Sequence, residues 1–143
     1  MRRLSASILI ASLAVSLSAC SHGNRPKTEL AASNVTTIGV NSYLWRASLD
    51  TLSFMPLLQT DSKGGVIVTD WYVDPNNAGQ RMKVTVSILD QDLRADALRV
   101  VALRQVNQNG TWVDAPVKAA TVQKLEDIIL TDARRLRRAA VSG

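Results

Sequence analysis

The spacing of apolar residues changes twice along the chain and separates two helical segments from a block of strands between them. After Asn41 or Ser42, either of which suits a helix N-cap, apolar residues recur at helical spacing until Pro56 forces a stop. From Leu57 the period becomes two, which is typical of strands. Over Ala119–Val141 the helical period returns, with an apolar stripe of Val122, Leu125, Ile129 and Leu136, widened by Ile128 and Leu130.

The middle of the chain predicts four to five strands. Gln80–Leu89 alternates strictly between apolar and polar residues, so this strand has one dry and one wet face. Asn109-Gly110 is the strongest hairpin signal in the chain. Strands that follow one another, rather than alternating with helices, imply an antiparallel α+β layer. The expected strands are 57–60, 66–73, 80–89, 97–108 and about 111–117.

We therefore expect an α+β fold in a single domain at residues 38–143. It consists of an antiparallel sheet of four to five strands, with an N-terminal helix and a long C-terminal helix packed on it. The chain is long enough for one domain with a modest core.

The first 19 residues have the pattern of a signal peptide. Arg2 and Arg3 precede an apolar run from Leu4 to Val15, and small residues follow up to Ala19. A membrane-spanning helix needs about 20 apolar residues, whereas this run is shorter and is broken by serines. Residues 1–19 are therefore expected to be removed by cleavage between Ala19 and Cys20.

Cys20 is the one cysteine of the chain and cannot form an internal disulfide, so in an exported protein it is free, paired between chains or modified. Leu17-Ser18-Ala19-Cys20 resembles the lipobox of bacterial lipoproteins. The resemblance implies that Cys20 carries a thioether-linked diacylglycerol and a fatty acid such as palmitate on its amino group. Such chains anchor a protein stably in a membrane. Cleavage at an ordinary signal-peptidase site, with an incidental cysteine, is the alternative.

The residues after Cys20 indicate where the anchored protein works. In bacterial lipoproteins an Asp after the lipidated cysteine marks inner-membrane retention, so Ser21 implies the periplasmic face of the outer membrane. Residues 20–37 are expected to be the lipidated cysteine and a flexible tether with an r.m.s. reach of roughly 20–25 Å. The folded domain therefore stays close to the membrane surface.

Charge and histidine content exclude several classes of function. The formal net charge is +5, and Arg2 and Arg3 of the signal supply part of it, so the weak excess argues against nucleic acid binding, as does export. The single histidine, His22, is two residues from Cys20. The folded domain therefore has no imidazole for a nucleophilic triad, a His-based acid–base pair or most transition-metal sites. We expect no catalytic site, cofactor or metal.

Carboxylates are the remaining candidates for chemistry. Asp70 on an apolar strand, with Asp61 nearby, is the best candidate for a buried acid; the alternative is an exposed Asp bonded to a turn. Asp90, Asp92 and Asp96 surround a loop, but the glycine and terminal glutamate of an EF-hand are missing there. Calcium binding is therefore not expected.

Three tryptophans and four arginines are candidates for a binding surface. Trp45 lies on the helical stripe and Trp71 on the apolar strand, which favours packing in the core, with Trp71 against the C-terminal helix; stacking on a ligand is the alternative. Trp112 follows a hairpin turn and is expected to be exposed. The end of the last helix is either a solvated basic face or a contact for anionic headgroups or an acidic partner, through Arg134, Arg135, Arg137 and Arg138.

Two segments, Gly39–Leu58 and Gly65–Tyr72, resemble a family of Gram-negative bacterial lipoproteins that carry a domain of unknown function. The likeness covers about residues 38–140 and implies no particular activity. A looser likeness is to the small lipoprotein of the outer-membrane β-barrel assembly machine, whose modules have a helix-grip fold, a sheet wrapped around a long helix. One such module is matched here, rather than two, at Trp45, Asp61, Gly65 and Trp71.

These features favour a non-enzymatic, lipid-anchored lipoprotein that binds a protein partner in outer-membrane assembly or maintenance. The alternatives are a carrier of a small ligand, lipid or glycan, and a hydrolase that uses only carboxylates. A deep apolar cavity would favour the carrier, and two facing carboxylates in a cleft would favour the hydrolase. An exposed apolar patch or an open sheet edge would favour the binding protein.

Overall fold

The computed structural model describes residues 39–142, so the predicted signal peptide, Cys20 and the tether lie outside the described residues. These residues form two α-helices, six strands and a single-turn 3₁₀ helix, η1. The elements in chain order are α1 (Ser42–Thr51), β1 (Leu57–Asp61), β2 (Val66–Thr69), β3 (Tyr72–Val73), β4 (Gln80–Ile88), η1 (Ala95–Ala97), β5 (Leu98–Gln108), β6 (Thr111–Ala115) and α2 (Ala119–Ser142).

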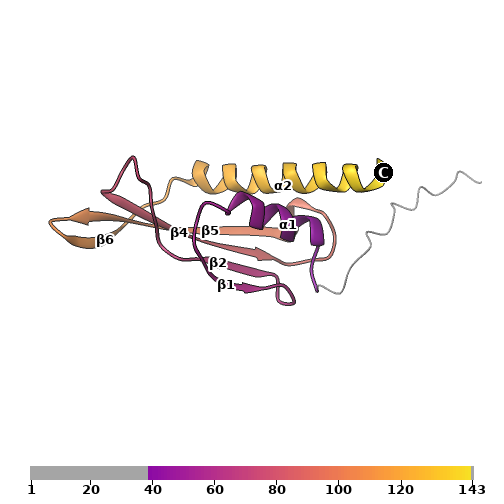
Figure 1. The fold of residues 1–143 in the computed structure, drawn as a ribbon, viewed down its shortest axis with the longest axis horizontal. Coiled ribbons are helices and arrows are strands. Elements are labelled where there is room, and N and C mark those ends of the chain that lie inside the picture. The colour runs from indigo at the N-terminus through magenta and orange to yellow at the C-terminus, as the bar shows by residue number, and fades with distance from the viewer. Residues whose placement is uncertain (1–38, 143) are drawn as a thin grey trace, which may run out of the picture.

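The strands form one antiparallel sheet in the order β1-β2-β4-β5-β6, with β3 pairing β4 beyond the end of β2. Both helices pack on one face of this sheet, and α1 lies alongside α2 (Figure 1). The predicted class, an antiparallel α+β fold with a short first helix and a long last helix, is confirmed. Within residues 39–142, neither helix is both long and apolar enough to cross a membrane.

The sheet has six strands rather than four to five, because the strand expected at 66–73 is broken at Asp70. The backbone N–H of Asp70 donates to the Pro56 carbonyl (2.7 Å), and its carboxylate accepts from the Trp71 N–H (2.7 Å). The Thr69 hydroxyl accepts the Val84 N–H (2.9 Å), where a continuous strand would offer a carbonyl. Hydrogen bonds to side chains thus replace one step of the backbone hydrogen-bond ladder along β4.

Asn41 begins α1, as predicted, and ties it to the loop between β4 and β5. Its side-chain oxygen accepts the Leu44 N–H (2.9 Å), and its Nδ2 donates to the Gln91 carbonyl (2.7 Å). The backbone N–H of Asn41 donates to the Asp90 carbonyl (3.0 Å). This capping residue therefore fixes where the helix starts and which end of the sheet it covers.

The core lies between the two helices and the covered face of the sheet. The even-numbered residues of β4 and β5 turn inward, as the alternation of 80–89 predicts. From α2, Ile129 and Ala133 are fully buried, whereas Ile128, which was expected to widen the apolar stripe, is 40% exposed. The buried sheet residues are Ile67, Thr69, Val84, Val86, Ile88, Leu98 and Val100.

The two segments that resemble the lipoprotein family meet at Gly65. This residue has φ +70°, and a Cβ atom there would lie 2.4 Å from the Ile88 carbonyl oxygen and 2.6 Å from a methyl of Val40. A Cβ on Gly39 would lie 2.5 Å from the Lys63 carbonyl oxygen. Both glycines are therefore required by backbone packing, and this part of the motif serves the fold.

The molecule is elongated, and its two ends differ (Figure 1). One end carries the β5–β6 hairpin, whose turn residues Asn109 and Gly110 both have positive φ, as the predicted hairpin requires. The other end holds the start of the described chain at Gly39 and the C-terminal end of α2.

Candidate functional site

An apolar groove of about 260 Å³ opens on the covered face of the sheet, beyond the last turn of α1. It exists because α1 ends at Thr51, before the covered face of the sheet does, while β4 begins at Gln80, beyond the end of the helix. The first turns of α2 close the opposite side. Its apolar lining consists of Leu52, Phe54, Met55, Tyr72, Met82, Val84 and Leu125.

The groove is bordered by an aromatic pair and by polar groups. The Phe54 ring meets the Tyr72 ring edge to face, with centroids 5.2 Å apart, and Phe54 is nonetheless 58% exposed. The Gln80 side-chain oxygen accepts a hydrogen bond from Arg104 Nε (3.0 Å). Asp74 also borders the groove and is the one carboxylate among its lining residues. The site therefore offers apolar contact with few polar groups to orient a bound segment.

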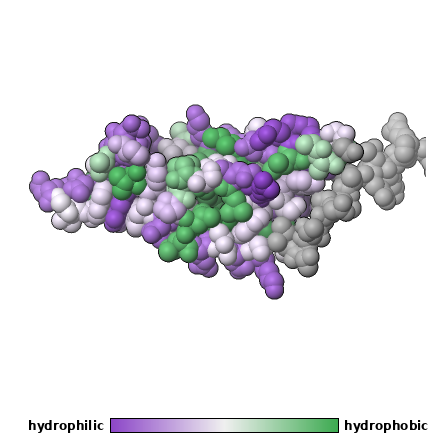
Figure 2. Space-filling view, viewed as in Figure 1, coloured by the Kyte–Doolittle hydropathy of each residue, from purple (hydrophilic) through white to green (hydrophobic). Residues whose placement is uncertain are grey.

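Apolar surface continues from Phe54 onto β1, where Leu57 is 47% exposed and Leu58 is 59% exposed. Figure 2 shows hydrophobic surface gathered near the middle of the molecule, where the segment joining α1 to β1 runs. We call Phe54, Leu57 and Leu58 the apolar rim. Single exposed apolar residues are ordinary, but three within five positions of the chain, one of which lines an apolar groove, are typical of an interaction site.

Strand β1 is one edge of the sheet, so the backbone groups on its outer side have no strand beside them. All five of its residues are exposed. Its register against β2 shifts between Leu57 and Gln59, which places a bulge at Leu58. An exposed edge strand can accept an added strand, with side-chain specificity supplied by nearby apolar residues.

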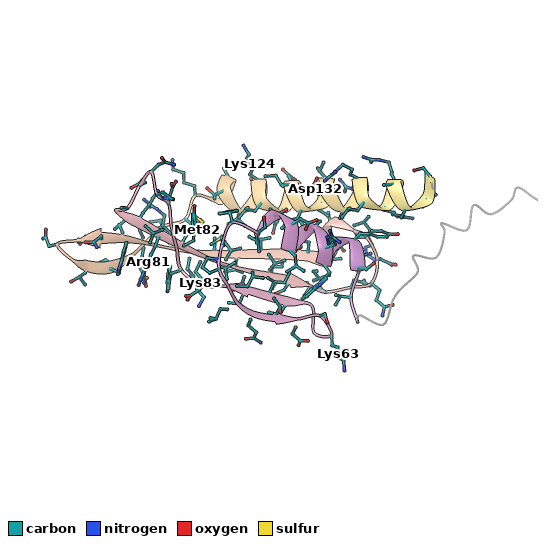
Figure 3. All side chains as sticks on the ribbon, in the orientation of Figure 1. Lys63, Arg81, Met82, Lys83, Lys124 and Asp132 are labelled. Carbon is teal, nitrogen blue, oxygen red and sulfur yellow. The ribbon has the colours of Figure 1, made fainter. Side chains whose placement is uncertain are left out.

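The opposite face of the sheet holds Arg81 between two tryptophans. Its guanidinium carbon lies 4.6 Å from the ring centroid of Trp71 and 4.6 Å from that of Trp112. Arg81 Nε donates to the Gln105 side-chain oxygen (2.8 Å), and Gln105 Nε2 donates to Asp114 (2.8 Å). In Figure 3, Arg81 and Lys83 extend away from α2, whereas Met82 between them lies toward it. This stack links β3 to the hairpin.

The expectation that Trp71 packs against the C-terminal helix is wrong. Tyr72 pairs with Met82 and faces the core, so Trp71 turns to the open face under Arg81. The break at Asp70 shifts the alternation by one residue, and a one-residue shift exchanges the two faces of a strand. Trp112, expected to be exposed, is half-buried by the same arginine, while Trp45 packs against the core as expected.

The carboxylates singled out in the sequence serve turns. Asp70 is exposed, and Asp61 Oδ1 accepts the N–H groups of Lys63 (3.0 Å) and Gly64 (3.1 Å). Asp90 accepts the Gln91 N–H (2.6 Å). The hydrogen bond from Arg94 to Asp96 lowers the pKa of that carboxyl. In the part of the chain that the structure describes, no three side chains form a group that could hold a metal ion.

Most of the arginines near the C-terminal end of α2 are exposed to solvent. Arg134, Arg135 and Arg138 are exposed and Arg137 is half-buried. Arg135 forms an ion pair with Asp132 at 3.1 Å. Ala19 and Cys20, the predicted cleavage and lipidation residues, lie outside the described residues.

Sequence reasoning missed the groove. Its walls come from four separate elements, and only the packing of α1 and α2 on the sheet brings them together. The available signal was local: Phe54, the only phenylalanine of the chain, is two residues before Pro56, in the turn that follows α1. A large apolar residue in the turn after a helix does not continue the apolar stripe that the helix buries, so its exposure calls for a separate explanation.

Residues 38–138 match the family described as Domain of unknown function (DUF3576), and the chain belongs to this family. The match confirms that the two segments belong to a domain of unknown function. The uncharacterized protein RP420 of Rickettsia prowazekii (strain Madrid E) is 40% identical over 95 residues, which make up 66% of this chain and 57% of that protein. The chain therefore spans little more than half the length of this relative.

Proposed function

We propose that this protein is a non-enzymatic lipoprotein, anchored through Cys20 to the periplasmic face of the outer membrane, whose groove binds an apolar segment of a protein partner. Its role would lie in outer-membrane assembly or maintenance, which the looser likeness to the β-barrel assembly lipoprotein suggests. The observation that carries the binding role is the apolar groove bordered by an exposed Phe54.

The size of the groove favours a protein segment over a whole small ligand. Sites for drug-sized ligands usually have about 300–1,000 Å³ and bury most of the ligand. At about 260 Å³ and open to solvent, this groove fits one or two large side chains. Such anchor side chains supply much of the energy in protein interfaces. The remaining contacts would come from the apolar rim and the edge of β1.

A small apolar ligand is the second candidate, because the lining is apolar and the opening carries the edge-to-face pair of Phe54 and Tyr72. Mass spectrometry of solvent extracts from protein purified out of envelopes tests this candidate. A stoichiometric lipid or other apolar compound that is lost with Phe54→Glu would favour it over a protein segment.

The anchor is proposed from the likeness of Leu17-Ser18-Ala19-Cys20 to a lipobox. Labelling cells with a fatty-acid analogue tests it. We expect label on the wild-type chain and none on Cys20→Ala, which should also accumulate as uncleaved precursor. Label on the variant at the wild-type level would contradict lipidation at this residue.

The partner site is tested with a matched pair of acidic substitutions. Phe54→Glu places a charge at the groove, and Leu103→Glu places one at a similarly exposed position on the uncovered face of the sheet. Both positions are exposed, so both variants should fold. After crosslinking in cells and purification from solubilised envelopes, we expect the partner adduct to be lost in Phe54→Glu and retained in Leu103→Glu. Equal recovery of the adduct with both variants would refute the groove as the binding site.

A further inference from the structure

The C-terminal turns of α2 form a basic surface, which we call the arginine end; it consists of Arg134, Arg135, Arg137 and Arg138. No acidic residue follows Asp132 in the chain. Asp132 pairs with Arg135, and among residues 39–142 no other carboxylate lies within ion-pair distance of these four arginines. Most of the positive charge of the arginine end is therefore available to a partner.

The arginines lie where α2 leaves the rest of the domain. Ala133 is the last buried residue of the helix, Leu136 is half-buried, and all described residues from Arg138 onward are exposed. At about 100° per residue, Arg134 and Arg138 share one side of the helix, away from Ala133 and Leu136. The helix thus rests on the domain through its apolar stripe while it presents guanidinium groups to solvent.

The start of the described chain lies at the same end of the molecule as the arginine end (Figure 1). Gly39 enters the domain there, and the β5–β6 hairpin is at the opposite end. A lipid anchor at Cys20 is only 19 residues before Gly39 in the sequence. The anchor would therefore hold the arginine end, rather than the hairpin, close to the membrane.

We propose that the arginine end binds anionic phospholipid headgroups and so fixes the orientation of the anchored domain. This inference rests on the proposed anchor at Cys20. A guanidinium can bind a phosphate through two parallel hydrogen bonds, and it remains charged at any physiological pH. Each basic residue near an anionic surface strengthens association by roughly fivefold. Three exposed arginines would then contribute about a hundredfold, while the lipid supplies the permanent attachment.

This orientation leaves the groove free for its partner. The groove contacts α2 at Thr121 and Leu125. Because a helix rises 1.5 Å per residue, Leu125 lies about 13 Å along the axis from Arg134. The loop between β4 and β5, which bonds to Asn41 near the arginine end, carries Asp90 and Asp92. Their negative charge disfavours an approach of the sheet to an anionic surface, so α2 makes the contact.

The test uses the chain from residue 20 with Cys20→Ser, which cannot be lipidated, and vesicles with or without phosphatidylglycerol in phosphatidylcholine. We expect co-sedimentation with the anionic vesicles at low salt, and its loss at about 0.5 M NaCl, where screening is strong. Arg134→Glu, Arg135→Glu and Arg138→Glu together should weaken partitioning by more than about a hundredfold, because they remove three positive charges and add three negative ones. The same three positions changed to Lys should retain most of the binding.

Lys118→Glu with Lys124→Glu is the control, because it reverses one charge just before the start of α2 and one in its first turns, where Lys124 points away from the sheet (Figure 3). We expect the control to bind anionic vesicles nearly as well as the parent. If the triple Glu variant melts lower than the parent, the corresponding Arg→Gln triple replaces it.

The inference fails if the parent does not bind anionic vesicles at low salt, or if the triple variant binds as well as the parent. An equal loss in the control would also overturn it, because the binding would then reflect net charge alone. The outcome is independent of the fatty-acid labelling of Cys20 and of the Phe54→Glu experiment. Failure here with normal labelling would remove the orientation and leave the proposed function intact.

Discussion

The two faces of the sheet come from the same strands, yet they differ in what covers them. On one face, Val84, Val86 and Ile88 of β4 are at most 2% exposed beneath the helices. On the other, Val101 and Leu103 of β5 are 50% and 55% exposed. Strand alternation alone assigns residues to two faces, but only the helices decide which face is dry. The open face instead depends on the stack of Arg81 between Trp71 and Trp112.

The covered face also changes along its length. Near Asn41 it is sealed by α1, and beyond Leu52 it opens into the groove. Apolar surface therefore occurs in three settings: buried, half-open in the groove, and exposed on the uncovered face. We propose partner binding at the half-open groove, because a concave apolar site lets an inserted side chain lose its contact with water.

The largest effect is expected where the covered face is driest. Ile129 on α2 is fully buried, and Ile129→Ala should lower the free energy of unfolding by about 2–5 kcal/mol. The neighbouring Ile128 is 40% exposed, and Ile128→Ala should cost less than about 1 kcal/mol. Urea unfolding of both variants measures the difference. Similar losses for the two would mean that α2 does not pack on the sheet through this stripe.

An intermediate effect is expected on the open face. Arg81→Ala removes two cation–π contacts and the hydrogen bond to Gln105, which together should contribute about 1–3 kcal/mol. Lys83→Ala, two residues along the same strand and on the same face, should change stability by less than about 0.5 kcal/mol. The tryptophan emission should shift to longer wavelength only in Arg81→Ala. Wild-type emission and stability in that variant would show that the stack is not maintained in solution.

The smallest effect is expected at the exposed pair of Arg94 and Asp96, which lies outside both faces. The pKa of Asp96 is lowered in the folded protein, chiefly by its hydrogen bond to Arg94. Its stabilising contribution is therefore present above the unfolded pKa, about 3.9, and is lost as the pH falls through the folded pKa. Asp96→Asn should melt slightly below wild type at neutral pH and together with it near pH 2. A difference that grows on acidification would contradict this sign.

Most of the fold could be predicted from the sequence, because its signals are local. Asn41 caps α1, the helix ends before Pro56, Asn109-Gly110 turns the hairpin, and β4 alternates. The error in the strands came from Asp70, whose hydrogen bonds to Trp71 and Pro56 compete with the ladder. A pattern of apolar residues does not show such competition, and the face assigned to Trp71 was therefore reversed.

The candidate site was less predictable, because it depends on where the elements stop. Phe54 and Tyr72 are separated by a complete hairpin, and they meet because α1 ends before the sheet does. Arg81 likewise brings Trp71 and Trp112 together from segments on either side of β4. Such contacts depend on register and strand order, which no single segment encodes. The arginines of α2, by contrast, could be recognised from helical periodicity alone.

The most direct test of the account compares the groove with the open face in living cells. A photo-crosslinking amino acid is placed at Phe54 or at Leu103, which are exposed to similar extents, 58% and 55%. We expect a discrete partner adduct from position 54 and none from position 103. Filling the groove with Met82→Trp should abolish the adduct from position 54. An adduct from position 103 alone would contradict the central claim, because the partner would then bind the uncovered face of the sheet.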